Sequence, residues 1–178
     1  MHEQVLRFWF AEIVPEQWWS ADPAFDEQVR TRFGTLLARA SQGELSDWRD
    51  TPRGRLAELV VLDQFSRNVH RGTPRAFAQD AMALVLAQEA LRANAERSLS
   101  PIETGFLLLP FMHSESAAIH VQAERLFREL APDDNYQFEL RHKAIIDRFG
   151  RYPHRNAILG RESTPEERAF LEQPGSRF

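Results

Sequence analysis

Apolar residues recur at helical spacing in the stretches between the prolines of this chain. A stripe of apolar residues three to four positions apart is typical of an amphipathic helix, and no stretch alternates as a half-buried strand would. In two stretches the expected buried faces are Phe77, Ala81, Leu84 and Leu91, and Ile119, Ala123, Leu126 and Leu130. We predict an all-α fold with helices near residues 2–12, 23–41, 52–70, 74–94, 101–109, 115–130, 133–149 and 165–172. Because most loops are short, neighbouring helices should form stacked antiparallel hairpins.

The expected helix starts share a local signal, in which proline follows a residue that caps helices. The capping oxygen accepts a hydrogen bond from a first-turn amide, and proline has no amide hydrogen to leave unpaired there. The marked starts are Asp22-Pro23, Thr51-Pro52, Thr73-Pro74, Ser100-Pro101 and Thr164-Pro165. Glu167 adds a capping box to the last of them. Gly72 and Gly150 should end helices, and Pro110 should end the helix that starts at Pro101.

The composition is that of a single globular domain over residues 1–178, with 43% hydrophobic and 27% charged residues. A net charge of -4 and a pI near 5.9 argue against a nucleic-acid partner, because such proteins usually present a basic face. The chain has no cysteine, which excludes disulfides and thiolate metal sites. No apolar run could span a bilayer and the first residues do not resemble a signal peptide, so we expect a cytoplasmic protein without a membrane partner.

Basic charge is concentrated in two similar segments, residues 60–71 (VVLDQFSRNVHR) and 144–155 (AIIDRFGRYPHR). At one constant offset the matching pairs are Asp63 with Asp147, Phe65 with Phe149, Arg67 with Arg151, His70 with His154 and Arg71 with Arg155. The match indicates either an internal duplication, which helical-repeat folds often show, or a coincidence in an arginine-rich chain.

Asp63 continues the buried stripe of Leu56, Leu59 and Val60, where a carboxylate is costly unless it is paired. Arg67 lies one turn later, in the favourable order for such a pair. For Asp63 itself, an ion pair that fastens two helices is a simpler interpretation than a catalytic role. The arginines and histidines of the two segments outnumber the acids within them. We therefore expect an external anion as the partner of the surplus.

The block PFMHSE, residues 110–115, places His113 at a junction between two helices. Ser114 or Ser116 can cap the second helix, and Glu115 would lie near its positive end, which is a sufficient structural explanation for these residues. The adjacent His113, Ser114 and Glu115 are weak evidence for a serine nucleophile, because a catalytic triad requires convergence in space.

Glu139-Leu140-Arg141-His142 has the Glu-x-x-His spacing of helical di-metal sites. Such a site needs a second motif, which the sequence lacks, and nearby arginines disfavour a cation. His142 also falls on a buried helix face, where a hydrogen-bonded core histidine is more usual than a ligand. The chain has no glycine-rich phosphate loop either, so we expect neither a metal nor a cofactor.

Three long blocks, LDQFSRNVHRGTPRAFAQD (62–80), LPFMHSE (109–115) and IDRFGRYPHRNAILGRESTPEE (146–167), resemble the bacterial family of unknown function numbered 924. FWF near the start and the pair Trp18-Trp19 agree with it, and the resemblance covers essentially the whole chain. It implies an all-helical fold similar to tetratricopeptide-repeat (TPR) superhelices, and no established activity or catalytic residues. One departure is that the family tends to have an arginine and a tyrosine just before the PFMHSE-like block, where this chain has Thr104 and Leu108.

We predict that the helices at 52–70 and 133–149, with the loop through Arg161, bring these side chains to one concave pocket. The pocket would bind a small anionic molecule or the carboxylate of a peptide, held by arginines that the aspartates orient, while histidines donate or shuttle protons. The predicted site consists of Asp63, Arg67, His70, Arg71, His113, Glu115, His142, Asp147, Arg151, His154, Arg155, Asn156 and Arg161.

Two other classes of function remain open at this point. A hydrolase or transferase would use the histidines as acid and base, and requires a histidine within hydrogen-bond reach of an aspartate. A protein-interaction scaffold would instead present a groove with exposed aromatic residues, for which Trp18, Trp19 and Trp48 are the candidates. The sequence predicts no particular oligomeric state.

Overall fold

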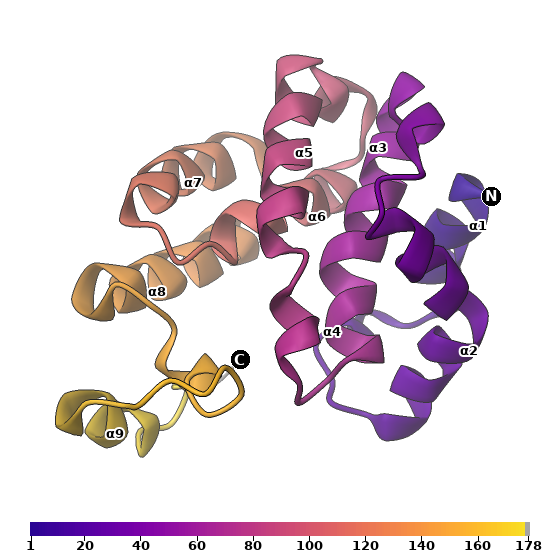
Figure 1. The fold of residues 1–178 in the computed structure, drawn as a ribbon. Helices are drawn as coiled ribbons and strands as arrows, with labels where there is room; N and C mark the ends of the chain where they lie inside the picture. The colour runs from indigo at the N-terminus through magenta and orange to yellow at the C-terminus, as the bar shows by residue number, and fades with distance from the viewer. Residues whose placement is uncertain (177–178) are drawn as a thin grey trace.

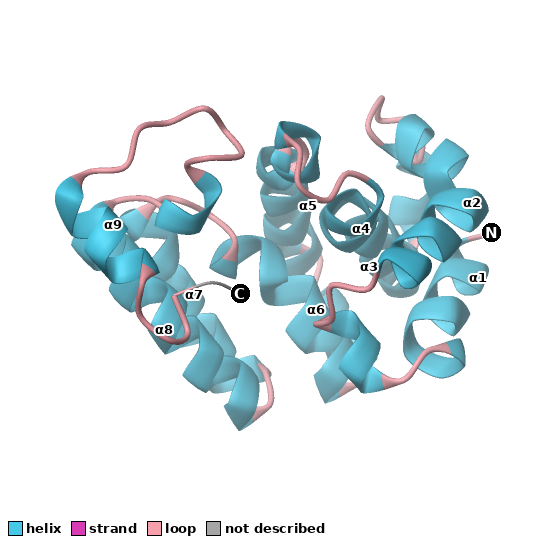
Figure 2. Ribbon diagram, turned by 90° about the horizontal axis from the view of Figure 1, so that it is seen from below, coloured by secondary structure: helices cyan, strands magenta, loops and turns pink. Residues whose placement is uncertain are grey.

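The computed structural model describes residues 1–176, and over this range its regular elements are all helical (Figures 1 and 2). The α-helices are α1 (His2–Arg7), α2 (Pro23–Ala40), α3 (Pro52–Leu59), α4 (Ser66–Val69), α5 (Asp80–Arg92), α6 (Pro101–Met112), α7 (Ala117–Leu130), α8 (Asp133–Phe149) and α9 (Pro165–Leu171). Short 3-10 turns are η2 (Pro15–Trp18), η3 (Ser46–Asp50), η5 (Pro74–Phe77), η6 (Ala95–Ser98) and η7 (Pro153–Arg155), and the π-helical turns are η1 (Phe8–Glu12) and η4 (Val60–Phe65). The predicted all-α class is confirmed.

Most of the predicted helix starts are capped as expected. The side chains of Asp22, Thr51, Ser100 and Thr164 each accept a hydrogen bond from a first-turn amide. Thr73 is the exception, because its hydroxyl donates to the carbonyl of His70 at 2.7 Å. The predicted helix at 74–94 is accordingly wrong at its start, where η5 precedes α5. Gly72 and Gly150 follow helices with the positive φ of 75° and 68° that glycine adopts readily.

Pro110 does not end its helix, contrary to the prediction. It lies within α6, which continues to Met112, and residues 104–112 are all buried. A proline inside a helix costs about 3 kcal/mol, whereas each fully buried large apolar side chain contributes roughly 1.5–3 kcal/mol. Burial of the apolar residues around Pro110 therefore outweighs its local cost.

The helix α6 lies in the middle of the molecule, with α1 to α4 on one side and α7 to α9 on the other (Figure 1). It packs against α5 and α7, and α7 pairs with α8. The main core includes Phe8, Trp9 and Phe65, and a smaller cluster of Ile145, Ile146 and Tyr152 lies toward α9. In the described part of the chain, no helix is both long enough and apolar enough to cross a membrane.

The buried face of α5 differs from the predicted one. Ala83, Ala87 and Ala90 are fully buried, while Ala81 is exposed and Leu84 is only half-buried. Small side chains on this face let α5 pack closely against α3 and α6. Close packing, rather than the most hydrophobic side chains, therefore decides which face of α5 is buried.

Candidate functional site

Asp63 is buried in the π-helical turn η4 and is surrounded by hydrogen-bond donors. Its carboxylate accepts from Nε2 of Gln64 at 2.6 Å and from Nδ1 of His113 at 2.8 Å. The predicted ion pair with Arg67 is confirmed, with Nη1 at 3.2 Å from Oδ1. Burial opposes ionisation of this carboxyl group, but the charge of Arg67 and the contact with His113 hold its pKa well below the usual range.

Asp80, at the start of α5, joins the two arginine-rich segments. Arg67 donates to both carboxylate oxygens, at 2.9 and 3.1 Å, and Nη1 of Arg155 donates to Oδ2 at 3.0 Å. Nη2 of Arg155 also donates to the carbonyl of His113 at 3.1 Å. The structure thus brings Asp63, Arg67, His113 and Arg155 of the predicted site together, through an acid that the sequence did not single out. We call these four residues and Asp80 the Asp63 cluster.

Arg155 is almost fully buried between two aromatic rings. Its guanidinium carbon lies 4.5 Å from the centre of the Phe77 ring and 4.7 Å from that of Tyr152. Burial lowers the pKa of Arg155, and the positive charge of Arg67 lowers it further. Its Nε is buried without a hydrogen-bond acceptor among the described residues, which is unusual for a charged donor.

A second cluster links the segment 151–167 to the start of α7. Arg161 forms a two-bond ion pair with Glu115 at 2.7 and 2.9 Å, and Glu115 also accepts from the backbone amide of Tyr152 at 2.7 Å. Nε of Arg161 donates to Asn156 at 2.9 Å. Burial opposes ionisation of Glu115, but these hydrogen bonds hold its pKa below the usual value.

Glu167 anchors the far end of this second cluster. Arg151 donates to its two oxygens at 2.7 and 2.8 Å, and Asn156 donates to one of them at 3.2 Å. Led by the hydrogen bonds from Arg151, these contacts lower the pKa of Glu167 to about 2. The sequence identified Glu167 only as part of a capping box, a role that it also fulfils.

Two of the predicted histidines, His142 and His154, lie beside the ring of Tyr152. Nδ1 of His142 hydrogen-bonds the carbonyl of Phe138 at 2.8 Å, so His142 behaves as the core histidine that the sequence also allowed. The rings of His142 and His154 lie 5.8 and 5.6 Å from that of Tyr152. Burial lowers the pKa of His142 to about 3 and that of His154 to about 4.

Three predicted site residues lie away from both clusters. Arg71 forms its ion pair with Asp26 of α2, with Nε 2.5 Å from Oδ2. Asp147 is half-exposed and pairs with Lys143 one turn earlier. His70 follows α4 and lines a hollow against α2. The structure does not bring these three to the Asp63 cluster, and the residues matched between the two segments have different partners.

The acids missing from the two segments are supplied by the rest of the fold. Each arginine that the sequence selected has a carboxylate partner, and most of the partners belong to other elements. The pairs are Arg67 with Asp63 and Asp80, Arg71 with Asp26, Arg151 with Glu167, Arg155 with Asp80, and Arg161 with Glu115. Asp80 is the last residue of the sequence block 62–80, but its position in the sequence does not predict a contact with Arg155.

Two hollows in the described part of the chain lie away from the Asp63 cluster. One of about 300 Å³ lies between α2, α4 and residues 75–79, and includes only His70 of the predicted site. The other, of about 210 Å³, is lined by Phe10, Trp18, Ser100, Ile102 and Glu103. Within residues 1–176, no group of three or more histidine or acidic side chains is arranged to hold a metal ion.

The chain belongs to the family described as bacterial proteins of unknown function DUF924, whose family model matches residues 5–175. It is also similar to a solved structure, that of the protein of unknown function ATU0120 from Agrobacterium tumefaciens. The two chains share 37% sequence identity over 96% of each, with a TM-score of 0.90. No curated protein matches the chain. The comparisons therefore establish the family and the fold, and name no ligand or reaction.

Proposed function

We propose that the protein binds a small anionic ligand at the Asp63 cluster, where Arg155 meets His113. The observation that carries the proposal is the Nε of Arg155, a buried cationic donor without an acceptor among the described residues. An oxyanion that reaches Arg155 would supply this acceptor, and Asp80 and the His113 carbonyl already hold the guanidinium in a fixed plane. A peptide carboxylate offers the same oxygen atoms as a small molecule.

A thermal-shift screen with phosphate, sulfate, dicarboxylates and nucleotides tests this proposal. An anion at 100 times its Kd should stabilise the fold by about 2.7 kcal/mol, or roughly 5–10 °C in a domain of this size. Arg155→Lys should remove the shift, because an ammonium group cannot replace the planar guanidinium. Arg71→Lys is the matched control, since Arg71 occupies the corresponding position in the first segment and pairs with Asp26. A shift with phosphate or sulfate that survives Arg155→Lys would contradict the proposal.

The second candidate is acid–base catalysis at the same cluster, as in a hydrolase or transferase. The observation that favours it is the 2.8 Å hydrogen bond between Nδ1 of His113 and the buried Asp63. This bond would leave the Nε2 of His113 as the proton acceptor, an arrangement that general-base histidines share. Burial and the neighbouring Arg67 lower the pKa of His113, which favours the neutral form that a base requires.

Release of p-nitrophenol from its phosphate and acetate esters provides a first assay for this candidate. His113→Gln should reduce turnover by about 10²–10⁴-fold, the usual contribution of a general base. His70→Gln is the control, because His70 lies in the separate hollow beside α2. Equal turnover in the two variants would exclude His113 as the base.

For the fold in more detail, we propose a TPR-like, right-handed stacking of the helical hairpins, which would suit a protein-interaction scaffold. The contacts of α6 with α7 and of α7 with α8 are consistent with successive hairpins. Of the three candidate tryptophans, Trp19 is exposed, and it stacks on Phe106 at 5.8 Å, while Trp18 and Trp48 are half-buried. Capture of a peptide that is lost in Trp19→Ala but kept in Trp48→Ala would support this use.

A further inference from the structure

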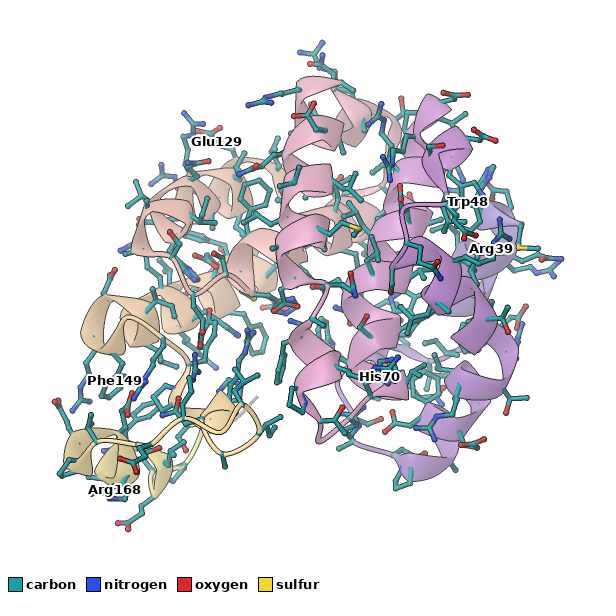
Figure 3. All side chains as sticks on the ribbon, in the orientation of Figure 1. Arg39, Trp48, His70, Glu129, Phe149 and Arg168 are labelled. Carbon is teal, nitrogen blue, oxygen red and sulfur yellow. The ribbon has the colours of Figure 1, made fainter. Side chains whose placement is uncertain are left out.

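A hollow of about 300 Å³ lies on the side of α4 that faces α2. Figure 3 labels one of its residues, His70, just after α4. The lining residues are Gly34, Leu37, Ala38, Ser41 and Gln42 from the second half of α2 and just beyond, Ser66, Val69 and His70 from α4 and its end, and Arg75, Ala78 and Gln79 from the segment before α5. The volume is at the lower end of the range for small-molecule sites, and would admit a compact organic molecule.

Three polar groups in this hollow have no partner among the described residues. The hydroxyl of Ser66 is buried and makes no hydrogen bond. The guanidinium of Arg75 forms no ion pair, and the imidazole of His70 forms no hydrogen bond, within the part of the chain that the structure describes. Arg75 is exposed and His70 is half-buried, so water can solvate both, whereas the buried hydroxyl of Ser66 is of the kind that is usually paired. The unsatisfied hydroxyl beside Arg75 and His70 therefore indicates a ligand at this hollow.

The charge around the hollow favours an anion. None of its lining residues is acidic, whereas Arg75 contributes a full positive charge. Arg30 lies close enough that its charge, after burial and the charge of Arg75, lowers the pKa of His70. This contrasts with the Asp63 cluster, where arginines and carboxylates balance.

The floor of the hollow is apolar. Leu37 and Val69 are buried there, and Ala38 and Ala78 form part of the wall. An inorganic anion such as phosphate would leave this apolar surface without a contact. A ligand with a small apolar body and one charged end would cover the floor and meet the basic rim.

We infer that this hollow is a binding site for a small organic carboxylate. The carboxylate would pair with Arg75 and accept a hydrogen bond from His70, and the apolar body would lie on Leu37 and Val69. A second polar atom on the ligand would satisfy the hydroxyl of Ser66. The site lies apart from the Asp63 cluster and does not depend on the function proposed for it.

Titration of the protein with benzoate and hexanoate tests this inference, with benzyl alcohol as the uncharged counterpart of benzoate. Binding is followed through the imidazole proton signals of the histidines, assigned by comparison with His70→Gln. We expect saturable shifts of the His70 signals with both carboxylates, and at least tenfold weaker binding of the alcohol. Arg75→Gln should weaken binding of the carboxylates by roughly tenfold or more, as expected for loss of a charged hydrogen bond.

Gly34 lines the hollow and allows a second variant that fills it. A Cβ at Gly34 would meet only Cγ of Arg30, at 3.9 Å, and the position is helical. Gly34→Leu should fold normally, with an unchanged or higher melting temperature, and lose the carboxylate-dependent shifts. Arg128→Gln, an exposed arginine of α7, is the matched charge control and should bind as the wild type does.

The outcomes separate this site from the Asp63 cluster. Binding that is lost in Gly34→Leu and Arg75→Gln, and kept in Arg155→Lys, supports a carboxylate site in the hollow. If neither probe produces saturable shifts, or if Gly34→Leu binds as the wild type does, the inference is wrong. Binding that is lost only in Arg155→Lys would also overturn it, and would assign the carboxylates to the Asp63 cluster instead.

Discussion

Arg67 and Arg155 both donate to the same carboxylate oxygen, Oδ2 of Asp80, at 3.1 and 3.0 Å. Two guanidinium groups on one acid repel each other, and the pKa of Arg155 is lowered by its burial and by the charge of Arg67. Asp80 therefore holds together two segments that are distant in the sequence, and it does so with little exposure to solvent.

Asp80→Asn should destabilise the protein more than a typical surface substitution. The change keeps the shape of the side chain but leaves Arg155 without a carboxylate partner, and breaking such a buried pair usually costs about 3–5 kcal/mol. Urea unfolding monitored by circular dichroism measures the effect. Asp147→Asn is the control, because its pair with Lys143 is half-exposed and should contribute less than about 1 kcal/mol. Equal losses in the two variants would contradict this role for Asp80.

Stability should fall as the pH decreases from about 6.5. In the folded protein burial lowers the pKa of His142 to about 3 and that of His154 to about 4. Below about pH 6.5 the unfolded chain binds protons that these two groups exclude, at a cost of up to about 1.4 kcal/mol per pH unit for each group. The contribution of neutral His142 and His154 to the free energy of unfolding is complete above that pH. It is lost as the pH falls towards the pKa values of the folded protein.

His142→Gln tests this dependence on pH, because glutamine can still donate to the Phe138 carbonyl that His142 contacts. The free energy of unfolding, measured in urea between about pH 7 and pH 5, should depend less steeply on pH in the variant. The difference in slope should approach that of one proton taken up on unfolding, about 1.4 kcal/mol per pH unit. Identical pH profiles for the wild type and the variant would mean that folding does not lower the pKa of His142.

The two serines that precede α6 and α7 should differ in their contribution to stability. Ser100 accepts a hydrogen bond from the amide of Glu103, and Glu103 accepts from the amide of Ser100 in return. Ser100→Ala should therefore cost about 1 kcal/mol. Ser116 makes no side-chain capping bond, so Ser116→Ala should stay within about 0.5 kcal/mol of the wild type. Thermal unfolding of the two variants in parallel provides the measurement.

Two helical glycines should respond to alanine with opposite signs. A Cβ at Gly54 would lie 2.0 Å from the backbone carbonyl oxygen of Trp48, so Gly54→Ala must displace the backbone of η3. We expect a loss of about 1–3 kcal/mol, as for overpacked cores. Gly34→Ala meets no such obstacle and should stabilise α2 by about 0.5–1 kcal/mol. Chemical denaturation tests both, and a neutral Gly54→Ala would mean that η3 adapts freely.

Sequence patterns correctly predicted interactions between residues that are close together in the sequence. The spacing of Asp63 and Arg67 predicted an ion pair within one helical turn, and the structure contains it. Proline after a capping residue identified helix starts for the same reason, since the cap and the amide that it binds lie within three residues. The pattern failed at Pro110 and at the buried face of α5, where packing against other helices decides the outcome.

The sequence by itself determined the helical class of the protein, most of its helix boundaries and the residues that carry unusual charge. Only the tertiary structure decided the partners of that charge: Arg155 meets Asp80, Arg151 meets Glu167, and Arg71 meets Asp26. The helical repeat places residues three or four positions apart next to each other, so the sequence predicts those contacts. An ion pair between distant elements depends instead on how whole helices pack. For this reason His70, which the sequence grouped with Asp63, lies instead in a hollow against α2.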